Sequence, residues 1–383
     1  MNGTIYMPVG EVCSSISDTY REKKNMVTLI NTSDVLEGRV LNHERVPNSN
    51  LKGQFKKTFQ RDDILYSEIR PQNRRFAYVD FSPIDYIAST KLMVIRAKKD
   101  VVSPKYLYYF LKNSSTVAEL QLLAETRSGT FPQITFSEVA NLTIPVPSLA
   151  VQEVIVQTMQ CLEDKITCNE QINDNLQQQA MSLYAEMFLN SSDSNVTSGT
   201  LSDIAVITMG QSPSGSSYNE DGVGEVFYQG RAEFGFRFPK RRLFTTEPKR
   251  IAEAGDVLLS VRAPVGDLNI AYERCCIGRG LGAIHSKTGH SSFVLYTMFA
   301  LRSQLDVFNG EGTVFGSINR DALNAIPIDI PPVTEIDQFE VVAHPIDELI
   351  RANCEENCRL EAIRDSLLPK LMSGEIDVSA VQL

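Results

Sequence analysis

Side chains that can read the edges of DNA bases gather just after a predicted strand in the first third of the chain. Tyr66 is followed by Arg70, Asn73, Arg74 and Arg75 within ten residues. An arginine can donate to guanine O6 and N7 together, and an asparagine can pair with adenine N6 and N7. Each of these residues alone is more often a solvated surface residue. As a set on one loop, they predict contacts with double-stranded DNA.

A second set with the same chemistry lies in the latter half of the chain. Amide and guanidinium groups suit base edges, whereas lysine and arginine bind the phosphate backbone irrespective of sequence. Lys249 and Arg250 are further phosphate candidates. The predicted DNA contacts of this set are Gln211, Tyr228, Gln229, Arg231, Lys240, Arg241, Arg242, Arg262 and Arg279.

Motifs that would give the chain chemistry of its own are missing from the sequence. There is no Asn/Asp-Pro-Pro-aromatic motif for amino methylation, no P-loop lysine, and no Pro-Asp pair upstream of Glu247-Pro248-Lys249 to complete a nuclease site. The glycines of residues 278–282 follow no βαβ pattern, so a tight turn or a close backbone approach explains them better than a dinucleotide site. We expect no catalytic residue, no cofactor and no metal in this chain.

Two long helices are predicted to position the two sets. From residue 149 to about residue 187, seam positions alternate in steps of four and three, which is the a/d pattern of a coiled coil, and the same seam returns 184 residues later. The centre of each seam holds two asparagines, Asn169 and Asn173 in the first copy and Asn353 and Asn357 in the second. Asparagine at a seam position fixes register at some cost in stability. If a pseudo-two-fold axis relates the copies, the helices pack antiparallel, with Asn169 facing Asn357 and Asn173 facing Asn353.

Local signals set the expected ends of these helices. Ser148 is predicted to cap the first and Thr334 the second, and Pro369 is predicted to kink or stop the second. Their acids Glu163, Asp164, Asp347 and Glu348 are candidate exposed contacts for a partner protein, although simple solvation also explains them. Four of the seven cysteines also lie in the helices, where we expect reduced thiols that act as small apolar residues: Cys161, Cys168, Cys354 and Cys358.

The remainder of the chain predicts two α+β domains that echo each other. Residues 63–67 match residues 256–260, and residues 129–134 match the closing sequence at 312–318. A first domain at 1–147, a helix and linker at 148–198, a second domain at 199–332 and a helix and tail at 333–383 therefore form one unit used twice. The predicted strands span residues 26–30, 64–69, 76–81, 92–95, 225–229 and 256–261, and the predicted domain helices span 104–112 and 292–301.

The net charge of −10 is unevenly distributed along the chain. The four segments 1–145, 146–198, 199–330 and 331–383 carry net charges of +4, −6, −1 and −7. Acidic helices therefore alternate with basic or nearly neutral domains, a pattern that suits DNA contact by the domains and protein contact by the helices. No run of eighteen apolar residues or signal-like start is present, so we expect a cytoplasmic protein without membrane contact.

Several segments, taken in order, resemble the specificity subunit of type I restriction-modification enzymes. They are residues 67–71, Gly129-Thr130, the Ile-Pro-Val-Pro junction at 144–148, residues 256–267 and residues 371–376. The likeness covers the whole chain in the family's order of variable domain, conserved helix, variable domain and conserved helix. Arg364 departs from the apolar seam, because Ala180 stands at that position in the first copy.

The resemblance implies two target recognition domains, each reading one half of a bipartite, asymmetric DNA site, separated by two long antiparallel coiled-coil helices. The helices would set the gap between the half-sites and dock two methyltransferase subunits. S-adenosylmethionine, ATP and Mg²⁺ would be bound by partner subunits, and restriction or motor subunits would join through the complex. Without the resemblance, the residues also allow a two-domain protein-binding scaffold with no nucleic-acid role.

Overall fold

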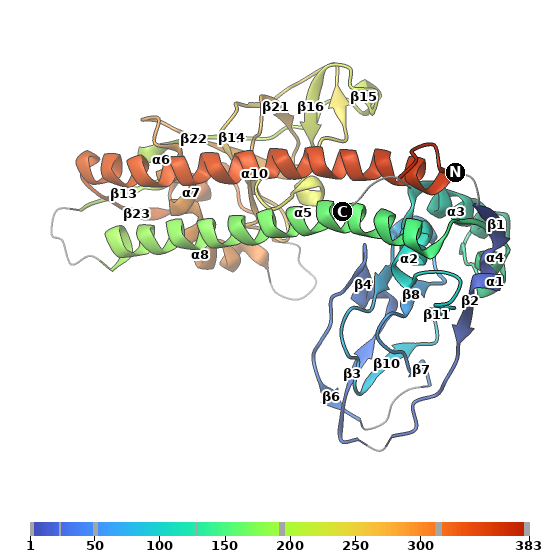
Figure 1. Ribbon diagram of the computed structural model, residues 1–383. Coiled ribbons are helices and arrows are strands. Elements are labelled where there is room, and N and C mark those ends of the chain that lie inside the picture. Colours follow the sequence, from blue (N-terminus) through green and yellow to red (C-terminus); the bar gives the residue numbers. More distant parts are fainter. Residues whose placement is uncertain are drawn as a thin grey trace. The chain divides into compact units, whose positions relative to one another are not determined.

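The computed structural model describes residues 4–22, 24–48, 53–127, 129–190, 196–310 and 316–378 (Figure 1). The chain divides into unit 1, residues 1–166 with 359–383, and unit 2, residues 167–358. Each unit contains an α+β domain and part of each of two long helices, α5 (Leu149–Tyr184) and α10 (Val333–Ser373). Residues 191–195 of the predicted linker and 312–315 of the second closing sequence lie outside the described residues.

Two four-stranded sheets and one strand pair form most of the domain of unit 1. β1 (Ile5–Pro8) pairs antiparallel with β12 (Thr143–Val146), so the start of the domain is bound to its end. The first sheet has the order β6-β3-β10-β7, with β3 (Met26–Ile30), β6 (Val46–Pro47), β7 (Phe55–Lys57) and β10 (Tyr86–Ser89). The second has the order β2-β11-β8-β9, with β2 (Cys13–Ile16), β8 (Ile64–Ser67), β9 (Phe76–Tyr78) and β11 (Leu92–Ala97).

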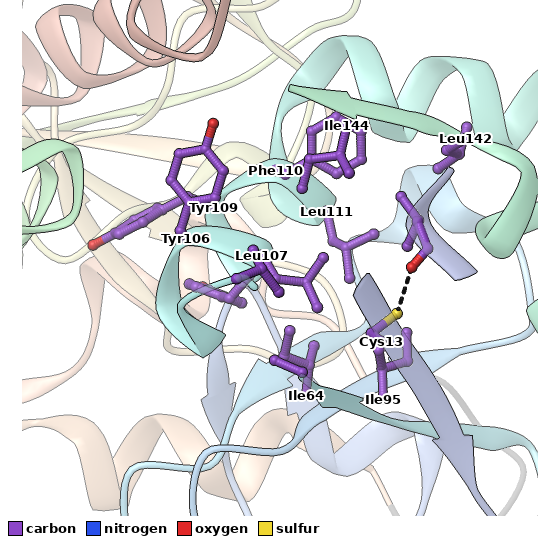
Figure 2. Close-up of a cluster of buried hydrophobic side chains, with 14 of the residues drawn as sticks. Cys13, Ile64, Ile95, Tyr106, Leu107, Tyr109, Phe110, Leu111, Leu142 and Ile144 are labelled. Atoms are coloured by element: carbon purple, nitrogen blue, oxygen red, sulfur yellow. Dashed lines mark hydrogen bonds between the residues drawn. The ribbon is translucent and has the colours of Figure 1, made fainter. Parts of the chain in front are cut away.

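Helix α2 (Pro104–Lys112) is the centre of the core of unit 1. It begins at Pro104, as predicted, and the side chain of Ser103 before it makes no capping hydrogen bond. Figure 2 shows Leu107 and Leu111 of this helix among Ile64, Ile95 and other buried side chains. All six residues from 106 to 111 are buried, because the sheet covers one side of α2 and apolar residues of the long helices join the same cluster. The other domain helices are α1 (Val9–Val12), α3 (Ser114–Arg127) and α4 (Phe136–Asn141).

Unit 2 repeats this plan. β13 (Thr197–Thr200) pairs antiparallel with β23 (Pro327–Ile330), as β1 does with β12. One sheet has the order β14-β22-β19-β20, with β14 (Ala205–Met209), β19 (Val257–Ser260), β20 (Leu268–Ile270) and β22 (Leu281–Ser286). The other has the order β15-β17-β16-β21-β18, with β15 (Tyr218–Asn219), β16 (Glu225–Tyr228), β17 (Phe244–Thr245), β18 (Ile251–Ala252) and β21 (Cys275–Ile277). The helices are α6 (Leu201–Ile204), α7 (Ser291–Ala300), α8 (Arg302–Asp306) and α9 (Arg320–Asn324).

The six strands and two domain helices predicted from sequence are all present. Four of the strands, at 64–67, 76–78, 225–228 and 257–260, are shorter than predicted. The repeat extends to individual backbone hydrogen bonds, which recur at equivalent positions of the two domains. Ile134 N donates to Glu68 O at 2.9 Å in unit 1, and Ile318 N donates to Val261 O at 3.1 Å in unit 2. In both domains, the closing segment is therefore bound to the loop that follows a central strand, β8 or β19.

Within unit 2, the two long helices run antiparallel and meet at their asparagines. Asn169 Nδ2 donates to Asn357 Oδ1 at 2.8 Å, and Asn353 Nδ2 donates to Asn173 Oδ1 at 2.8 Å. These are the pairs that antiparallel packing predicts. Asn169 and Asn173 are buried, so an unpaired amide there would be costly and the register is specific.

The predicted cap of α10 is wrong, and so is a stop at Pro369, whereas a kink there stays a prediction. The helix already includes Val333, so Thr334 lies in its first turn and does not cap it. The helix also continues through Pro369 to Ser373. A proline removes one backbone donor, but the buried side chains of Leu368 and Leu371 hold this turn in the core of unit 1. At the start of α5, the Ser148 hydroxyl accepts from Val151 N at 3.4 Å, as a cap does.

The helix cysteines differ from the prediction. Cys161, Cys168 and Cys358 are exposed, and Cys354 is half-buried. The three exposed cysteines therefore do not fill the helix interface as small apolar residues would, whereas Cys354 lies against α5, with its Sγ 3.6 Å from Asn173 Nδ2. Across the described part of the chain, none of the helices is long and apolar enough to span a membrane.

Candidate nucleic-acid interface

A short 3₁₀ helix after β8 presents the first set of candidate residues. It spans Pro71–Asn73 and is flanked by Arg70 and Arg74, whose φ angles of 43° and 51° are left-handed. Non-glycine residues adopt this conformation at an energetic cost and do so more often at functional sites. Arg70 N donates to Pro132 O at 3.1 Å, so the closing segment supports the turn. The side chains of Arg70 and Asn73 are exposed.

The other two arginines of this turn bind the protein itself. Arg74 Nη2 donates to Ser114 Oγ at 3.0 Å, and Arg75 Nη1 donates to Ser33 O at 3.0 Å. Both side chains are half-buried. They hold the turn in place, and this leaves Arg70 and Asn73 as the members of the set that are best placed to meet a base.

Tyr66 and Tyr228 do not lie on a surface that DNA can reach, so their assignment as DNA contacts is wrong. Each is only 1% exposed. Tyr66 stacks on Phe76 with 5.4 Å between ring centroids, and the Tyr228 hydroxyl donates to Pro239 O at 3.4 Å. Every residue of β8 is buried, so the strand has no solvent face on which Tyr66 could stand. Burial raises the pKa of both phenols.

Tyr66→Phe is expected to change the free energy of unfolding by less than about 1 kcal/mol. The Tyr66 hydroxyl is buried and has no hydrogen-bond partner among the described residues, so its removal breaks no bond. Chemical denaturation of the two proteins side by side measures the difference. A loss of several kcal/mol would contradict this assignment and indicate a polar partner for the hydroxyl.

In unit 2, candidates from distant parts of the sequence come together on linked loops. Gln211 N donates to Ile277 O at 3.0 Å, Gly280 N to Gln229 O at 3.1 Å, and Val261 N to Gly280 O at 3.0 Å. These bonds connect the ends of β14, β16, β19 and β21. The exposed candidate side chains on these loops are Gln211, Gln229, Arg231, Arg262 and Arg279.

The glycines of this region permit the close approach of the loops. A Cβ atom on Gly278 would lie 2.8 Å from Gln229 Cα, and one on Gly280 would lie 2.8 Å from Gln229 O. Both distances are too short for non-bonded atoms, so only glycine fits. These residues therefore serve backbone packing, as the sequence predicts. No cluster of three or more histidine, cysteine, aspartate or glutamate side chains able to hold a metal occurs among the described residues.

Acidic side chains of the same domain hold several of the basic candidates. Arg231 pairs with Asp267, and Arg241 Nε lies 2.5 Å from Glu273 Oε1. Arg242 Nη2 donates to Glu233 Oε1 at 2.5 Å, and this bond raises the pKa of the guanidinium. The side chains of Lys240, Arg241, Arg242, Lys249 and Arg250 are exposed. The segment thus presents positive charge in a fixed arrangement, which suits contact with phosphates.

Two helix acids predicted to be exposed are instead bound to their own domains. Glu163 accepts a hydrogen bond from the Tyr109 hydroxyl at 2.8 Å, and Asp347 accepts one from the Tyr296 hydroxyl at 2.8 Å. Sequence inspection missed these contacts because the partners are more than fifty residues away. One signal was available, since the two acids are 184 residues apart and so occupy the same position of the repeat. Their neighbours Asp164 and Glu348 are exposed, as predicted.

Comparisons with known proteins agree with this architecture. The sequence profile of the family described as type I restriction modification DNA specificity domain matches residues 6–178 and again residues 193–355. The chain is 31% identical over 336 residues to the putative type I restriction enzyme MjaX specificity subunit of Methanocaldococcus jannaschii, which covers 82% of this chain and 79% of that protein. It is also 41% identical over 177 residues to the type I restriction enzyme HindI specificity subunit of Haemophilus influenzae, covering 46% of this chain and 39% of that protein.

The fold has a counterpart among solved structures. The type I restriction-modification system S subunit from M. genitalium aligns with a TM-score of 0.55 over 97% of both chains, at 16% sequence identity, a likeness that concerns the fold alone. The profile match and the relative from M. jannaschii concern the sequence itself. Together with the repeated domains, they show that this chain belongs to the type I restriction modification DNA specificity family.

Proposed function

We propose that this chain, as the DNA sequence-specificity subunit of a type I restriction-modification system, reads a bipartite, asymmetric site with one half-site for each domain. One observation carries the proposal: the two domains share one arrangement of sheets and closing segment, but their loops expose different side chains. The loop after β8 exposes Arg70 and Asn73, whereas the linked loops of unit 2 expose residues such as Gln229 and Arg279. Two domains of equivalent fold that expose different side chains suit two different half-sites.

The recognition domains in this proposal are residues 1–147 and 199–332. Residues 148–198 and 333–383 form two spacer helices with a linker and a tail. The helices act as an antiparallel coiled coil whose asparagine pairs hold the register near a pseudo-two-fold axis. The hydrogen bonds of Asn169 to Asn357 and of Asn353 to Asn173 support this role.

Base reading and phosphate binding are assigned to different residues. Arg70, Asn73, Gln211, Gln229, Arg262 and Arg279 have exposed side chains and are proposed to meet base edges. Residues that are already paired with acids, such as Arg231, Arg241 and Arg242, are proposed to contact phosphates together with Lys240. Arg74 and Arg75 chiefly shape the turn that carries Arg70.

The partners are proposed to be double-stranded DNA, two methyltransferase subunits and, through these, restriction or motor subunits. The long helices are acidic, and α10 exposes the apolar side chains of Val341, Val342 and Leu349, of which Val342 and Leu349 lie on the same side of the helix about two turns apart. Exposed apolar residues at helical spacing suit contact with a protein. In this assignment, the partners bind S-adenosylmethionine, ATP and Mg²⁺, and the present chain contributes sequence recognition without a catalytic group.

Co-expression of the chain with its methyltransferase is expected to create one new methylated motif made of two half-sites and a gap of fixed length. Single-molecule methylome sequencing of the host DNA measures this result. Cells that express the methyltransferase without this chain are the control and should lack the motif. If both cultures have the same methylome, the chain does not direct methylation, and a protein-binding scaffold becomes the better explanation.

A further inference from the structure

In each repeat, one acidic residue of a long helix binds side chains of the neighbouring domain. The two acids occupy the same position of the repeat. They are Glu163 of α5 in unit 1 and Asp347 of α10 in unit 2. Each acid accepts a hydrogen bond from one tyrosine hydroxyl and pairs with one cation, which is half-buried in unit 1 and buried in unit 2. We call these two clusters the helix anchors: Tyr109, Lys112 and Glu163 in unit 1, and Arg237, Tyr296 and Asp347 in unit 2.

In the anchor of unit 1, both bonds come from α2. The Tyr109 hydroxyl donates to Glu163 Oε2 at 2.8 Å, and Lys112 Nζ donates to Glu163 Oε1. The Lys112 ammonium also lies 4.6 Å from the centroid of the Tyr109 ring and 4.9 Å from that of Tyr108. Burial lowers the pKa of Lys112, and the charge of Glu163 opposes this shift. The charge of Glu163 therefore favours the charged form of Lys112 against the effect of burial.

In the anchor of unit 2, the tyrosine and the cation come from different parts of the domain. Tyr296 belongs to α7, whereas Arg237 lies in an irregular segment before β17 and is only 2% exposed. Arg237 Nη1 lies 3.3 Å from Asp347 Oδ1, outside hydrogen-bonding geometry, so an ion pair joins these two groups. Arg237 Nη2 also donates to Gln177 Oε1 of α5 at 3.1 Å. Burial raises the pKa of Asp347, and the charge of Arg237 opposes this shift.

The segment that supplies Arg237 also carries proposed DNA contacts. Arg231 precedes it, and Lys240, Arg241 and Arg242 follow it within five residues. A second connection starts from Arg241, whose guanidinium lies 5.5 Å from the centroid of the Tyr272 ring. The Tyr272 hydroxyl donates to Glu355 Oε1 of α10 at 2.8 Å. In unit 2, the basic segment is therefore fixed to both long helices by buried or half-buried polar groups.

Such contacts specify geometry more than they add stability. A buried ion pair gains little over well-packed apolar residues, because desolvation of the two charges offsets their attraction. A tilted domain, however, would separate the charges and leave one of them buried without a partner. The anchors therefore penalise every orientation of the domain on its helix except one. This property is useful to a protein that must present two reading surfaces at a fixed spacing.

We infer that Glu163 and Asp347 are positioning residues that hold each recognition domain in one orientation on its helix, and thereby set how strictly the gap between the half-sites is read. The inference rests on the proposed function. The two anchors act independently, so the loss of either one relaxes the gap requirement. Base preference within each half-site is unaffected, because no anchor residue belongs to the proposed base-reading loops.

The test uses a double variant that removes the charges and retains the packing, Arg237→Met with Asp347→Leu, in complex with the co-expressed methyltransferase. Binding is measured to duplexes that carry the methylated motif of the wild-type complex, with the natural gap and with the gap longer or shorter by one base pair. Each base pair shifts a half-site by about 3.4 Å along the duplex. We expect the preference for the natural gap to fall about tenfold, within the usual range of coupling between sites. Discrimination against single-base changes in either half-site should remain.

Matched variants separate positioning from general damage. Lys112→Met with Glu163→Leu removes the anchor of unit 1 and should relax the gap to a similar extent. Glu153→Gln and Glu335→Gln alter other acids of α5 and α10, of which Glu153 is exposed and Glu335 partly exposed, and should leave the gap preference unchanged. Arg237→Lys retains the positive charge and should keep most of the wild-type preference for the natural gap. If the double variants do not fold, Tyr296→Phe and Tyr109→Phe each remove one anchor hydroxyl and should reduce the preference about fivefold, at the lower end of such couplings.

Each outcome bears on a different statement. An unchanged gap preference in the double variants, or an equal loss of binding at all three gaps, would overturn the inference. Unchanged preference in both tyrosine variants would do the same where the double variants do not fold. A wild-type complex that methylates no bipartite motif would instead refute the proposed function, before any anchor variant is compared.

Discussion

Arg237→Met alone is expected to lower the free energy of unfolding of unit 2 by about 3–5 kcal/mol. The substitution leaves Asp347 in a site that already raises its pKa, without the guanidinium that opposes this shift. It also removes the hydrogen bond to Gln177 and the stacking of the guanidinium 6.0 Å from the Tyr296 ring centroid. Hydrogen exchange followed by mass spectrometry measures the loss, because it reports on the amides of each unit separately.

Two controls accompany this prediction. Arg274→Met removes an arginine that also pairs with carboxylates, those of Glu225 and Glu253, but at the surface, so a change of less than about 1 kcal/mol is expected. The double variant with Asp347→Leu should recover most of the lost stability, since it leaves no unpaired charge. Equal losses in the single and double variants would show that Arg237 acts by packing alone. Exchange in the domain of unit 1 serves as the internal reference.

The sequence predicted features that depend on local spacing. The seam identified both asparagine pairs, because a 3.5-residue period determines which side chains face a partner helix. The residues just after a predicted strand were chosen because their types suit base edges, and two of them, Arg70 and Asn73, are exposed on the loop after β8. The repeat of residues 63–67 at 256–260 identified two equivalent strands, β8 and β19.

Features that depend on distant contacts were missed. Tyr66 lies only four residues before Arg70 in sequence, but every residue of β8 is buried and the tyrosine belongs to the core. Arg237 stands in an irregular segment with no periodicity, and its partner is 110 residues further along the chain. Pro369 carries a strong local signal to end a helix, which the packing of Leu368 and Leu371 overrides. In each case, the structure is determined by a tertiary contact that local sequence spacing does not reveal.

Arg70→Ala is expected to relax base reading in one half-site and leave the other unchanged. A bidentate contact between an arginine and a guanine contributes about 1–3 kcal/mol of discrimination, roughly five- to 150-fold in affinity. Arg70 has a left-handed φ of 43° in the native turn, and alanine adopts this angle no more easily than arginine does. The substitution therefore removes the side chain without relieving or adding backbone strain. Competition binding of the complex to duplexes with each single-base change measures the effect.

A matched control distinguishes base contact from the effect of charge. Arg45 is another arginine of unit 1, 60% exposed and near Asp85, and Arg45→Ala should alter no base preference. If Arg70 contacts only a phosphate, the variant will bind all duplexes more weakly by the same factor, and the slope of log affinity against log salt will fall by about one unit. Unchanged discrimination in both half-sites would remove Arg70 from the reading surface. Asn73, the other exposed residue of the turn, would then be the next to test.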